Sequence, residues 1–380
     1  MKIILAPDSF KGSLTAPEAA EAMAKGVRKA MPEAETIEIP LADGGEGTAE
    51  SLVAATDGRM VHVIVTGPLG KPVEAAYGIL GDNETCVIEM AQASGICLVD
   101  PNERDPLKTT TFGTGELIRN ALDKGLRRFI LALGGSATND GGIGMLQALG
   151  MKLLDAKGKD VQYGGGELVR IETIDDRLFD ARIAEADFLI ATDVQNPLVG
   201  PDGASHVFGP QKGATFEVAE LLDTHLTHWA NLVEEKTGMR LHDLPGAGAA
   251  GGIGGAFQAF FPSRTKRGID LVIEYARLHE HLPGADCVFT GEGQIDYQTA
   301  SGKTPMGVAQ AAQAFNIPVF ALAGSVGEGI DTLYEYGITS AHSIVCGPIS
   351  LKQAITRAAE FVEQSAEQIT RIWLAGQSTK

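Results

Sequence analysis

The chain has 380 residues, more than the roughly 250 to 300 at which a single hydrophobic core usually divides, so we expect two domains. Its formal charge of -18, from 31 basic and 49 acidic side chains, argues against a nucleic-acid partner, which would need a basic surface. No stretch approaches the ~18 consecutive apolar residues of a membrane span, and the first apolar run is too short for a signal peptide. The four cysteines lack paired spacing and are expected as buried thiols, so we expect a cytoplasmic protein with no membrane partner.

The first 62 residues alternate between predicted strands and helices. Strands are expected at 2–6 and 37–39, and helices at 16–31 and 48–56. Thr15 and Glu18 have the spacing of a capping box at the start of the first helix. This alternation is typical of the opening of an α/β domain.

The pattern changes after Val61 and returns near the C-terminus. Alternating, turn-rich segments follow Val61 and predict antiparallel hairpins. Apolar strands resume at 286–291, 317–324 and 343–347, with helices at 304–315 and 351–374. We therefore predict a discontinuous Rossmann-like domain with a parallel sheet, 1–62 and 283–380, into which a larger α/β domain, 63–282, is inserted. The active site is expected in the cleft between these domains.

Five apolar runs each lead into a loop rich in small residues that carries an aspartate. The aspartates are Asp8, Asp43, Asp140, Asp193 and Asp296. An aspartate after a strand often only caps the next helix. Ligands, however, bind beyond the carboxyl ends of strands in open parallel sheets, and magnesium takes hard oxygen ligands that it shares with phosphates. The pattern therefore favours a phosphoryl-transfer enzyme.

Two glycine-containing motifs resemble nucleotide-binding sequences of other protein classes. Residues 246–251 match a dinucleotide fingerprint in spacing, but they follow no predicted strand, which disfavours a dehydrogenase. Residues 301–304 resemble the end of a Walker loop without its first glycine, so they are not a P-loop. They still place Lys303 and Thr304 at a helix start, with Thr304 as the expected N-cap, where they could contact phosphate or simply cap the helix.

Eight motifs read together closely resemble the bacterial type I glycerate kinase family over essentially the full chain. They are APDSFKGSLTA (6–16), PLADGGEGT (40–48), LGGSATNDGG (133–142), ATDVQNPLVG (191–200), FGPQKGA (208–214), PGAGAAGGIGGA (245–256), TGEGQID (290–296) and GKTP (302–305). The resemblance implies a two-domain kinase that uses ATP and Mg²⁺ to phosphorylate D-glycerate, with 2-phosphoglycerate as the usual product of this group. It also implies a place in the catabolism of glyoxylate or sugar diacids.

Phosphoryl transfer requires metal ligands, cationic contacts to the phosphoryl group and an acceptor for the hydroxyl proton. We expect Asp43, Glu46 and Asp296 to hold magnesium. Asp193 is our candidate for the general base, and Asp8 is the second choice.

Further side chains and backbone groups are expected to bind the substrates. Lys11 could pair with the glycerate carboxylate or the γ-phosphate, with a solvated surface lysine as the alternative. The remaining candidates for substrate or phosphate binding are Ser9, Gly44, Gly45, Gly134, Gly135, Ser136, Asn139, Asp140, Asn196, Lys212, Lys303 and Thr304. The glycines around 134 could equally form a purely structural turn.

Several alternatives remain open from the sequence. Transfer to the 3-hydroxyl, or to a related small hydroxy acid, would use the same residue types. A non-catalytic sensor of sugar acids is a further alternative, although it would need no magnesium carboxylates. The sequence leaves the oligomeric state open, a homo-oligomer included.

Overall fold

The computed structural model describes residues 1–377, apart from the side chains of Gln298 and Ser301. The chain divides into two compact units. Unit 1 comprises Met1–Asp43, Glu50–Thr56 and the chain from Arg267 onward, and unit 2 comprises Gly44–Ala49 and Asp57–Lys266. The domain limits expected at 62/63 and 282/283 stay a prediction.

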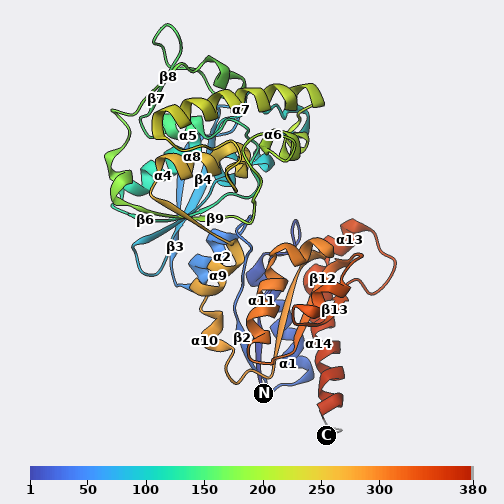
Figure 1. Ribbon diagram of the computed structural model, residues 1–380. Helices are drawn as coiled ribbons and strands as arrows, with labels where there is room; N and C mark the ends of the chain where they lie inside the picture. The colour runs from blue at the N-terminus through green and yellow to red at the C-terminus, as the bar shows by residue number, and fades with distance from the viewer. Residues whose placement is uncertain (378–380) are drawn as a thin grey trace. The chain divides into compact units, whose positions relative to one another are not determined.

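Unit 1 is built on a parallel sheet with the strand order β13-β12-β11-β1-β2. The strands are β1 (Lys2–Leu5), β2 (Glu35–Glu38), β11 (Cys287–Ile295), β12 (Val319–Val326) and β13 (Ile338–Ser343). The helices are α1 (Ala16–Ala30), α2 (Thr48–Ala55, whose first two residues belong to unit 2), α9 (Gly268–Tyr275), α10 (Leu278–His281), η7 (Tyr297–Ser301), α11 (Thr304–Gln313), α12 (Asp331–Glu335), α13 (Leu351–Thr356) and α14 (Ala358–Gln377). Helices from both ends of the chain cover this sheet (Figure 1).

The core of unit 1 joins the first and last segments of the chain. Met23 on α1 and Val362 on α14 share a buried cluster with Ile3 and Phe289 of the sheet. The predicted capping box of α1 is present, because Thr15 and Glu18 exchange hydrogen bonds with each other's backbone. A parallel sheet made by both chain ends confirms the discontinuous Rossmann-like domain.

Unit 2 contains a mixed sheet with the order β10-β9-β6-β5-β4-β3. The strands from β10 to β5 are parallel, and β4 and β3 run antiparallel, as the turn-rich sequence after Val61 predicted. Its strands are β3 (Arg59–Thr66), β4 (Pro72–Ile79), β5 (Thr85–Glu89), β6 (Arg128–Ala132), β9 (Asp187–Ala191) and β10 (Ser263–Lys266), together with a separate pair β7 (Lys152–Leu154) and β8 (Thr173–Asp175). This inserted sheet domain confirms the second part of the predicted fold class.

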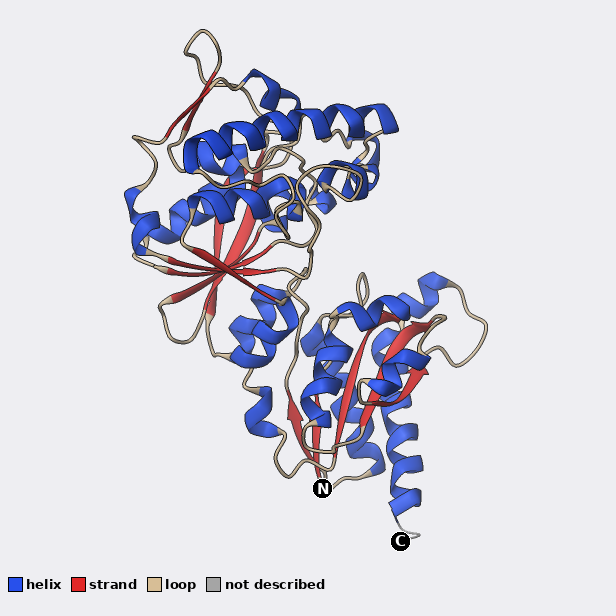
Figure 2. Ribbon diagram, viewed as in Figure 1, coloured by secondary structure: helices blue, strands red, loops and turns tan. Residues whose placement is uncertain are grey.

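Helices of unit 2 pack on its mixed sheet, and Figure 2 shows α5, α7 and α8 on one side of it. The α-helices are α3 (Ala91–Ser94), α4 (Phe112–Asp123), α5 (Ile143–Ala148), α6 (Ala204–Phe208), α7 (Phe216–Thr237) and α8 (Ile253–Phe260). The 3₁₀ helices are η1 (Ile96–Leu98), η2 (Pro101–Glu103), η3 (Gly165–Arg170), η4 (Ala181–Glu185), η5 (Pro210–Lys212) and η6 (Ala249–Gly252). Trp229 of α7 and Phe257 of α8 are buried in the same cluster as Phe188 of β9.

Several local predictions are corrected by the structure. The last strand ends at Ser343 instead of beginning there, as the expected bounds 343–347 would have it, and the expected final helix is two helices that break at Arg357. Cys97 and Cys346 are exposed, whereas Cys86 and Cys287 are buried as expected. Within residues 1–377, no helix is both long and apolar enough to cross a membrane.

Candidate active site

Two motifs of unit 1 come together because β1 and β11 are parallel neighbours. Leu5 of β1 pairs with Phe289 of β11, and beyond this pair the Asp8 N–H donates to the Gly291 carbonyl at 2.8 Å. Asp8 and Glu292 therefore lie beside each other, although 284 positions separate them in the chain. We call Asp8, Asp43 and Glu292 the acidic cluster.

The carboxyl of Asp8 is the most strongly perturbed group of the acidic cluster. Asp8 is 9% exposed, its Oδ1 accepts the Ser9 N–H at 2.6 Å, and its Oδ2 accepts the Thr304 hydroxyl at 2.5 Å. Burial, followed by the carboxylates of Asp43 and Glu292, raises the pKa of Asp8 to about 7. The three carboxylates are thus close enough to repel one another.

Glu292 is a member of this cluster that the sequence reasoning missed. It is 9% exposed, its Oε1 accepts the Thr299 hydroxyl at 3.0 Å, and its Oε2 accepts Lys303 Nζ at 3.0 Å. Burial raises its pKa, and the nearby Lys303 ammonium opposes that shift. The signal in the sequence was a glutamate between two glycines in the TGEGQID motif, which drew attention only to its aspartate.

Helix α11 begins next to the acidic cluster. Its N-cap is Lys303, one residue earlier than expected, and no side chain caps it. Thr304 is completely buried and gives its hydroxyl hydrogen to Asp8, and Pro305 occupies the first turn. The structure therefore brings the two predicted phosphate contacts, Lys303 and Thr304, to the acidic cluster.

The other predicted residues of unit 1 lie on the adjoining loops. Lys11 is exposed, and a Cβ at Gly293 would come within 3.3 Å of its backbone nitrogen, so the first loop packs closely against the TGEGQID motif. Asp296 accepts a hydrogen bond from Gln294 at 2.9 Å, and its N–H donates to the Thr299 hydroxyl at 3.2 Å. These contacts tie the C-terminal end of the TGEGQID motif to the start of η7.

In unit 2, two predicted residues leave the same edge of the mixed sheet. Ala132 of β6 pairs with Ala191 of β9, and on its other side it pairs with Glu89 of β5. Gly134 and Asp193 each follow two residues after that Ala132–Ala191 pair. Because the strands are parallel, the glycine-rich segment and the proposed base emerge side by side.

The segment 133–142, called the glycine loop below, has an exposed tip and a buried stem. Gly134 and Gly135 are exposed, whereas Ser136 is only 7% exposed. A Cβ at Gly134 would lie 3.0 Å from the Gly45 Cα, so the ADGGEGT and LGGSATNDGG motifs touch through their backbones. A side chain at Gly134 would require one of these two backbones to shift.

Asp140 forms part of the buried stem instead of facing solvent. Its Oδ2 accepts both the N–H and the hydroxyl of Thr111 at 2.8 Å, and its Oδ1 accepts the Gly142 N–H at 3.1 Å. The Thr111 hydroxyl in turn accepts the Met145 N–H at 2.9 Å. Burial raises the pKa of Asp140, and these donors oppose the shift. Its oxygens are occupied by the protein, so its observed contacts organise the loop.

Two predicted amides are also engaged by the protein. The Asn139 side chain is completely buried and donates to the Ser205 hydroxyl at 2.8 Å. Asn196 donates to the Asp202 carbonyl at 2.9 Å and lies on the loop that follows Asp193. Both side chains support loops beyond the sheet edge.

Lys212 contacts the buried stem of the glycine loop, and so does the motif at 246–251 that matches a dinucleotide fingerprint in spacing. Lys212 is 2% exposed, and its Nζ donates to the Thr138 carbonyl at 2.7 Å. Gly251 has φ +69°, and a Cβ there would lie 2.1 Å from the same carbonyl oxygen. The motif at 246–251 thus provides close packing for the loop, without a preceding strand.

Glu89 is a second residue that the sequence reasoning missed. It is 3% exposed, and its Oε1 accepts the Ala49 N–H at 2.7 Å, at the start of α2. The bond ties the end of the ADGGEGT motif to β5. The signal was present, since an acidic residue follows the apolar run 86–88 much as aspartates follow the five other runs, but here the residue is a glutamate.

The donor set of unit 1 suits magnesium, although it is not a complete metal site. No group of three or more His, Cys, Asp or Glu side chains within the described part of the chain is arranged to hold a metal ion by itself. Magnesium usually binds one or two carboxylates and takes its other ligands from water and substrate phosphates. The mutually repelling oxygens of Asp8, Asp43 and Glu292 fit that use. Of the other two expected ligands, Glu46 is exposed and belongs to unit 2, whereas Asp296 belongs to unit 1 and accepts the hydrogen bond from Gln294.

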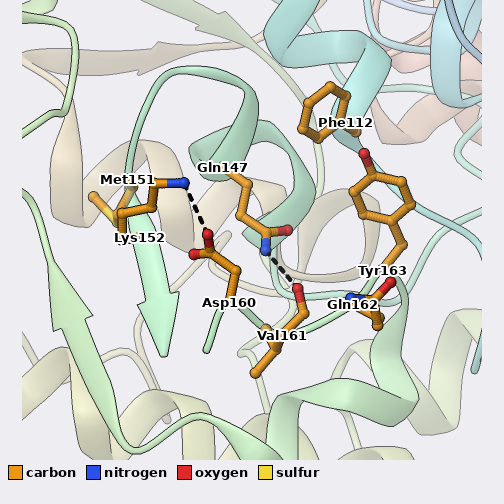
Figure 3. Close-up of a pocket in the computed structure, with 8 residues that line it drawn as sticks. All are labelled: Phe112, Gln147, Met151, Lys152, Asp160, Val161, Gln162 and Tyr163. Carbon is orange, nitrogen blue, oxygen red and sulfur yellow. Dashed lines mark hydrogen bonds and ion pairs between the residues drawn. The ribbon is translucent and has the colours of Figure 1, made fainter. Parts of the chain in front are cut away.

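A pocket elsewhere in unit 2 does not involve the predicted residues. It has a volume of about 290 Å³ and lies beside α5 and β7 (Figure 3). Its lining residues are Phe112, Gln147, Met151, Lys152, Asp160, Val161, Gln162 and Tyr163. Lys152 pairs with Asp160 at 2.8 Å, and Gln147 donates to the Val161 carbonyl at 3.0 Å, so these polar groups are used within the protein.

Comparison with known proteins decides the family. A sequence model described as the glycerate kinase family matches residues 3–374. The chain belongs to the glycerate kinase family. It is 50% identical over 369 residues to the glycerate kinase of Bacillus subtilis (strain 168), and the aligned region covers 97% of both chains. It is 46% identical over 369 residues to the glycerate 2-kinase of Escherichia coli (strain K12), again covering 97% of both.

A solved structure of this family has the same fold. It is the crystal structure of a protein assigned as glycerate kinase 2 of Salmonella typhimurium LT2, with a TM-score of 0.89 and 48% sequence identity. The similarity covers 100% of this chain and 99% of the other. The predicted fold class and family are therefore confirmed.

Proposed function

We propose that the protein transfers the γ-phosphoryl group of ATP to the 2-hydroxyl of D-glycerate in a magnesium-dependent reaction, giving 2-phospho-D-glycerate. The protein is a kinase by its family, and the E. coli relative is named a glycerate 2-kinase. The observation that carries the proposal is the acidic cluster beside Lys303 and Thr304, since phosphoryl transfer needs metal carboxylates and a cationic contact in one place.

The phosphate oxygens of ATP are bound, in this proposal, by the exposed backbone of the glycine loop. Gly134 and Gly135 present N–H groups, Ser136 adds a hydroxyl, and Gly44 and Gly45 supply the facing backbone. Gly44 has φ +92°, a conformation that favours glycine. Backbone donors and dipoles fixed before the reaction stabilise charge without reorganisation during the transfer.

Asp43 is the first magnesium ligand in this proposal, and Glu46 and Asp296 are the additional candidates. When bound, magnesium neutralises charge on the phosphate oxygens. The protein's own contribution is to keep the carboxylates of the acidic cluster close together through the bonds of Thr304 and Lys303.

The remaining roles concern the acceptor. Asp193 accepts the proton of the glycerate hydroxyl as general base, and Asp8 is the second choice. Lys11, Ser9 and Asn196 contact the acceptor or the transferred phosphoryl group. Lys11 is exposed on a loop that packs on Gly293, which allows its long side chain to reach a bound anion.

The test is ADP release on mixing the purified protein with D-glycerate, Mg²⁺ and ATP, followed by enolase without phosphoglycerate mutase. Formation of phosphoenolpyruvate is expected, because enolase acts on the 2-phosphate. If phosphoenolpyruvate forms only when mutase is added, the 3-hydroxyl is the acceptor. If glycerate causes no ADP release, related hydroxy acids must be screened, and a sugar-acid sensor becomes the better reading.

A further inference from the structure

Lys212 was expected to bind substrate, but its position points to another role. Its side chain is 2% exposed, and its Nζ donates to the Thr138 carbonyl at 2.7 Å. A substrate could not reach this ammonium group without opening the surrounding structure. The lysine contacts the buried stem of the glycine loop, four residues from the exposed Gly134.

The backbone around Lys212 is built to hold it there. Gly213 follows it with φ +95°, and a Cβ at Gly213 would lie 2.3 Å from the Arg104 carbonyl oxygen. A side chain at this position would therefore be excluded both by conformation and by space. The absence of a side chain at Gly213 therefore lets the chain directly after Lys212 pack against the Arg104 backbone.

A second hydrogen bond joins the stem of the glycine loop to a residue close to Lys212 in the chain. Ser205, on the preceding helix α6, accepts the Asn139 side-chain N–H at 2.8 Å. Gly209 caps the C-terminus of α6 by donating its N–H to the Ser205 carbonyl at 3.0 Å, so the FGPQKGA motif continues directly from that helix. Segment 203–214 thus makes hydrogen bonds with two consecutive residues of the stem, Thr138 and Asn139.

Electrostatics link the same lysine to Asp140. Burial lowers the pKa of Lys212 to about 7, and the Asp140 carboxylate opposes that shift. The Lys212 amine can donate to the Thr138 carbonyl whether or not it is protonated. Asp140 anchors the other end of the stem to Thr111, so the stem is held from both sides.

We propose that Lys212 is a positioning residue for phosphoryl transfer, which holds the Thr138 carbonyl and thereby sets the exposed tip of the glycine loop, Gly134 and Gly135, against the phosphates of ATP. It contacts neither glycerate nor ATP. This inference rests on the proposed kinase function and deepens it, because it assigns the lysine of the FGPQKGA motif to the loop instead of the substrate.

Steady-state kinetics of Lys212→Met and Lys212→Arg test the proposal, with Lys157→Met, an exposed lysine on the β7–β8 connection, as the matched control. We expect Lys212→Met to raise KM for ATP about tenfold, which is about 1.4 kcal/mol, while KM for glycerate changes less than twofold. Lys212→Arg, which keeps a cationic donor, should recover part of this change. Wild-type constants in folded Lys212→Met, or equal rises in both KM values, would overturn the proposal.

A measurement on the wild-type protein covers the case in which the variants fail to fold. An amine-reactive reagent, read by mass spectrometry, should label exposed Lys11 readily and Lys212 hardly at all, with the same slow rate in the presence of ATP, Mg²⁺ and glycerate. Ready labelling of Lys212 that substrates suppress would show a substrate contact and overturn the proposal. Labelling needs no turnover. Absence of kinase activity would therefore count against the proposed function and not against the buried contact between Lys212 and the Thr138 carbonyl.

Discussion

Glu89 Oε1 accepts the Ala49 N–H at 2.7 Å and so connects the last residue of β5 to the first turn of α2. Glu89 is 3% exposed, and the residues between Asp43 and Ala49 form the glycine-rich motif that touches Gly134. The bond therefore holds one of the two proposed phosphate-binding loops against the sheet edge from which the other loop emerges.

Replacing Glu89 with Ala should destabilise unit 2 and displace this loop. Loss of a buried bond to a charged acceptor costs about 1.5 to 3 kcal/mol of unfolding free energy, and KM for ATP should rise. Glu89→Gln retains an acceptor oxygen, so its free energy of unfolding should fall less than that of Glu89→Ala. Urea denaturation and steady-state kinetics measure both effects. Glu84→Ala is the control, because Glu84 is exposed and directly precedes the same strand; equal losses in the two alanine variants would contradict the role of Glu89.

Gly134→Ala tests the contact between the two glycine-rich motifs. The new Cβ would lie 3.0 Å from the Gly45 Cα, so one loop must move by a few tenths of an ångström. We expect KM for ATP to rise roughly three- to tenfold, because small misplacements of phosphate donors are costly. Gly347→Ala is the control, since no atom lies within 4 Å of its Cβ. Unchanged KM for ATP would argue against a phosphate site at this contact.

Asp193→Asn should lower kcat and kcat/KM together by roughly 10²- to 10⁴-fold if Asp193 is the general base. The melting temperature should change little, because the amide has nearly the same shape. Asp187→Asn, at the exposed opposite end of β9, provides the comparison. A rise in KM for glycerate with turnover near that of the wild type would show that Asp193 only binds the substrate.

Asp43→Asn should increase the magnesium concentration needed for half-maximal activity by about tenfold or more. The reason is that the amide removes one negative charge from the acidic cluster and supplies a weaker ligand. The measurement is activity against Mg²⁺ at saturating ATP and glycerate. Asp57→Asn removes an exposed carboxylate and should leave the titration unchanged. If both variants behave like the wild type, Asp43 is not a metal ligand.

The buried lysine predicts a pH dependence of stability. Burial lowers the pKa of Lys212 from 10.5 to about 7, so between these values the unfolded chain binds a proton that the folded chain has lost. Stability should therefore rise with pH across this window, by at most about 1.4 kcal/mol per pH unit from this group. Below pH 7 the lysine is protonated in both the folded and the unfolded state, so it no longer makes the free energy of unfolding depend on pH.

The comparison for that prediction is Lys212→Met, in which this contribution to the slope is absent. Urea unfolding of both proteins at pH 7, 8 and 9 measures the difference. The free energy of unfolding of the wild type should increase relative to that of Lys212→Met as the pH rises. Parallel curves over this range would mean that Lys212 keeps an ordinary pKa in the folded protein.

Much of the fold could be read from local patterns. The capping box at Thr15 and Glu18, the antiparallel hairpins after Val61 and the return of strands after residue 286 depend on neighbouring residues, so they were predictable. The strand expected at 343–347 was wrong by a shift, because a short apolar run does not determine which of its ends pairs with the sheet.

The sequence by itself determined the family, the fold class and the loops that carry chemistry, because those depend on ordered motifs and on hydrophobic periodicity. It could not determine which polar side chains face a ligand. Asp140 and Lys212 looked like substrate contacts, but both side chains are buried and bonded within unit 2. Glu89 and Glu292 drew no attention, yet Glu89 holds the N–H of Ala49 in unit 2 and Glu292 belongs to the acidic cluster of unit 1. Only tertiary structure decides burial and partners, since strand pairing joins residues as distant as Asp8 and Glu292, and a desolvated charge takes its role from the groups packed around it.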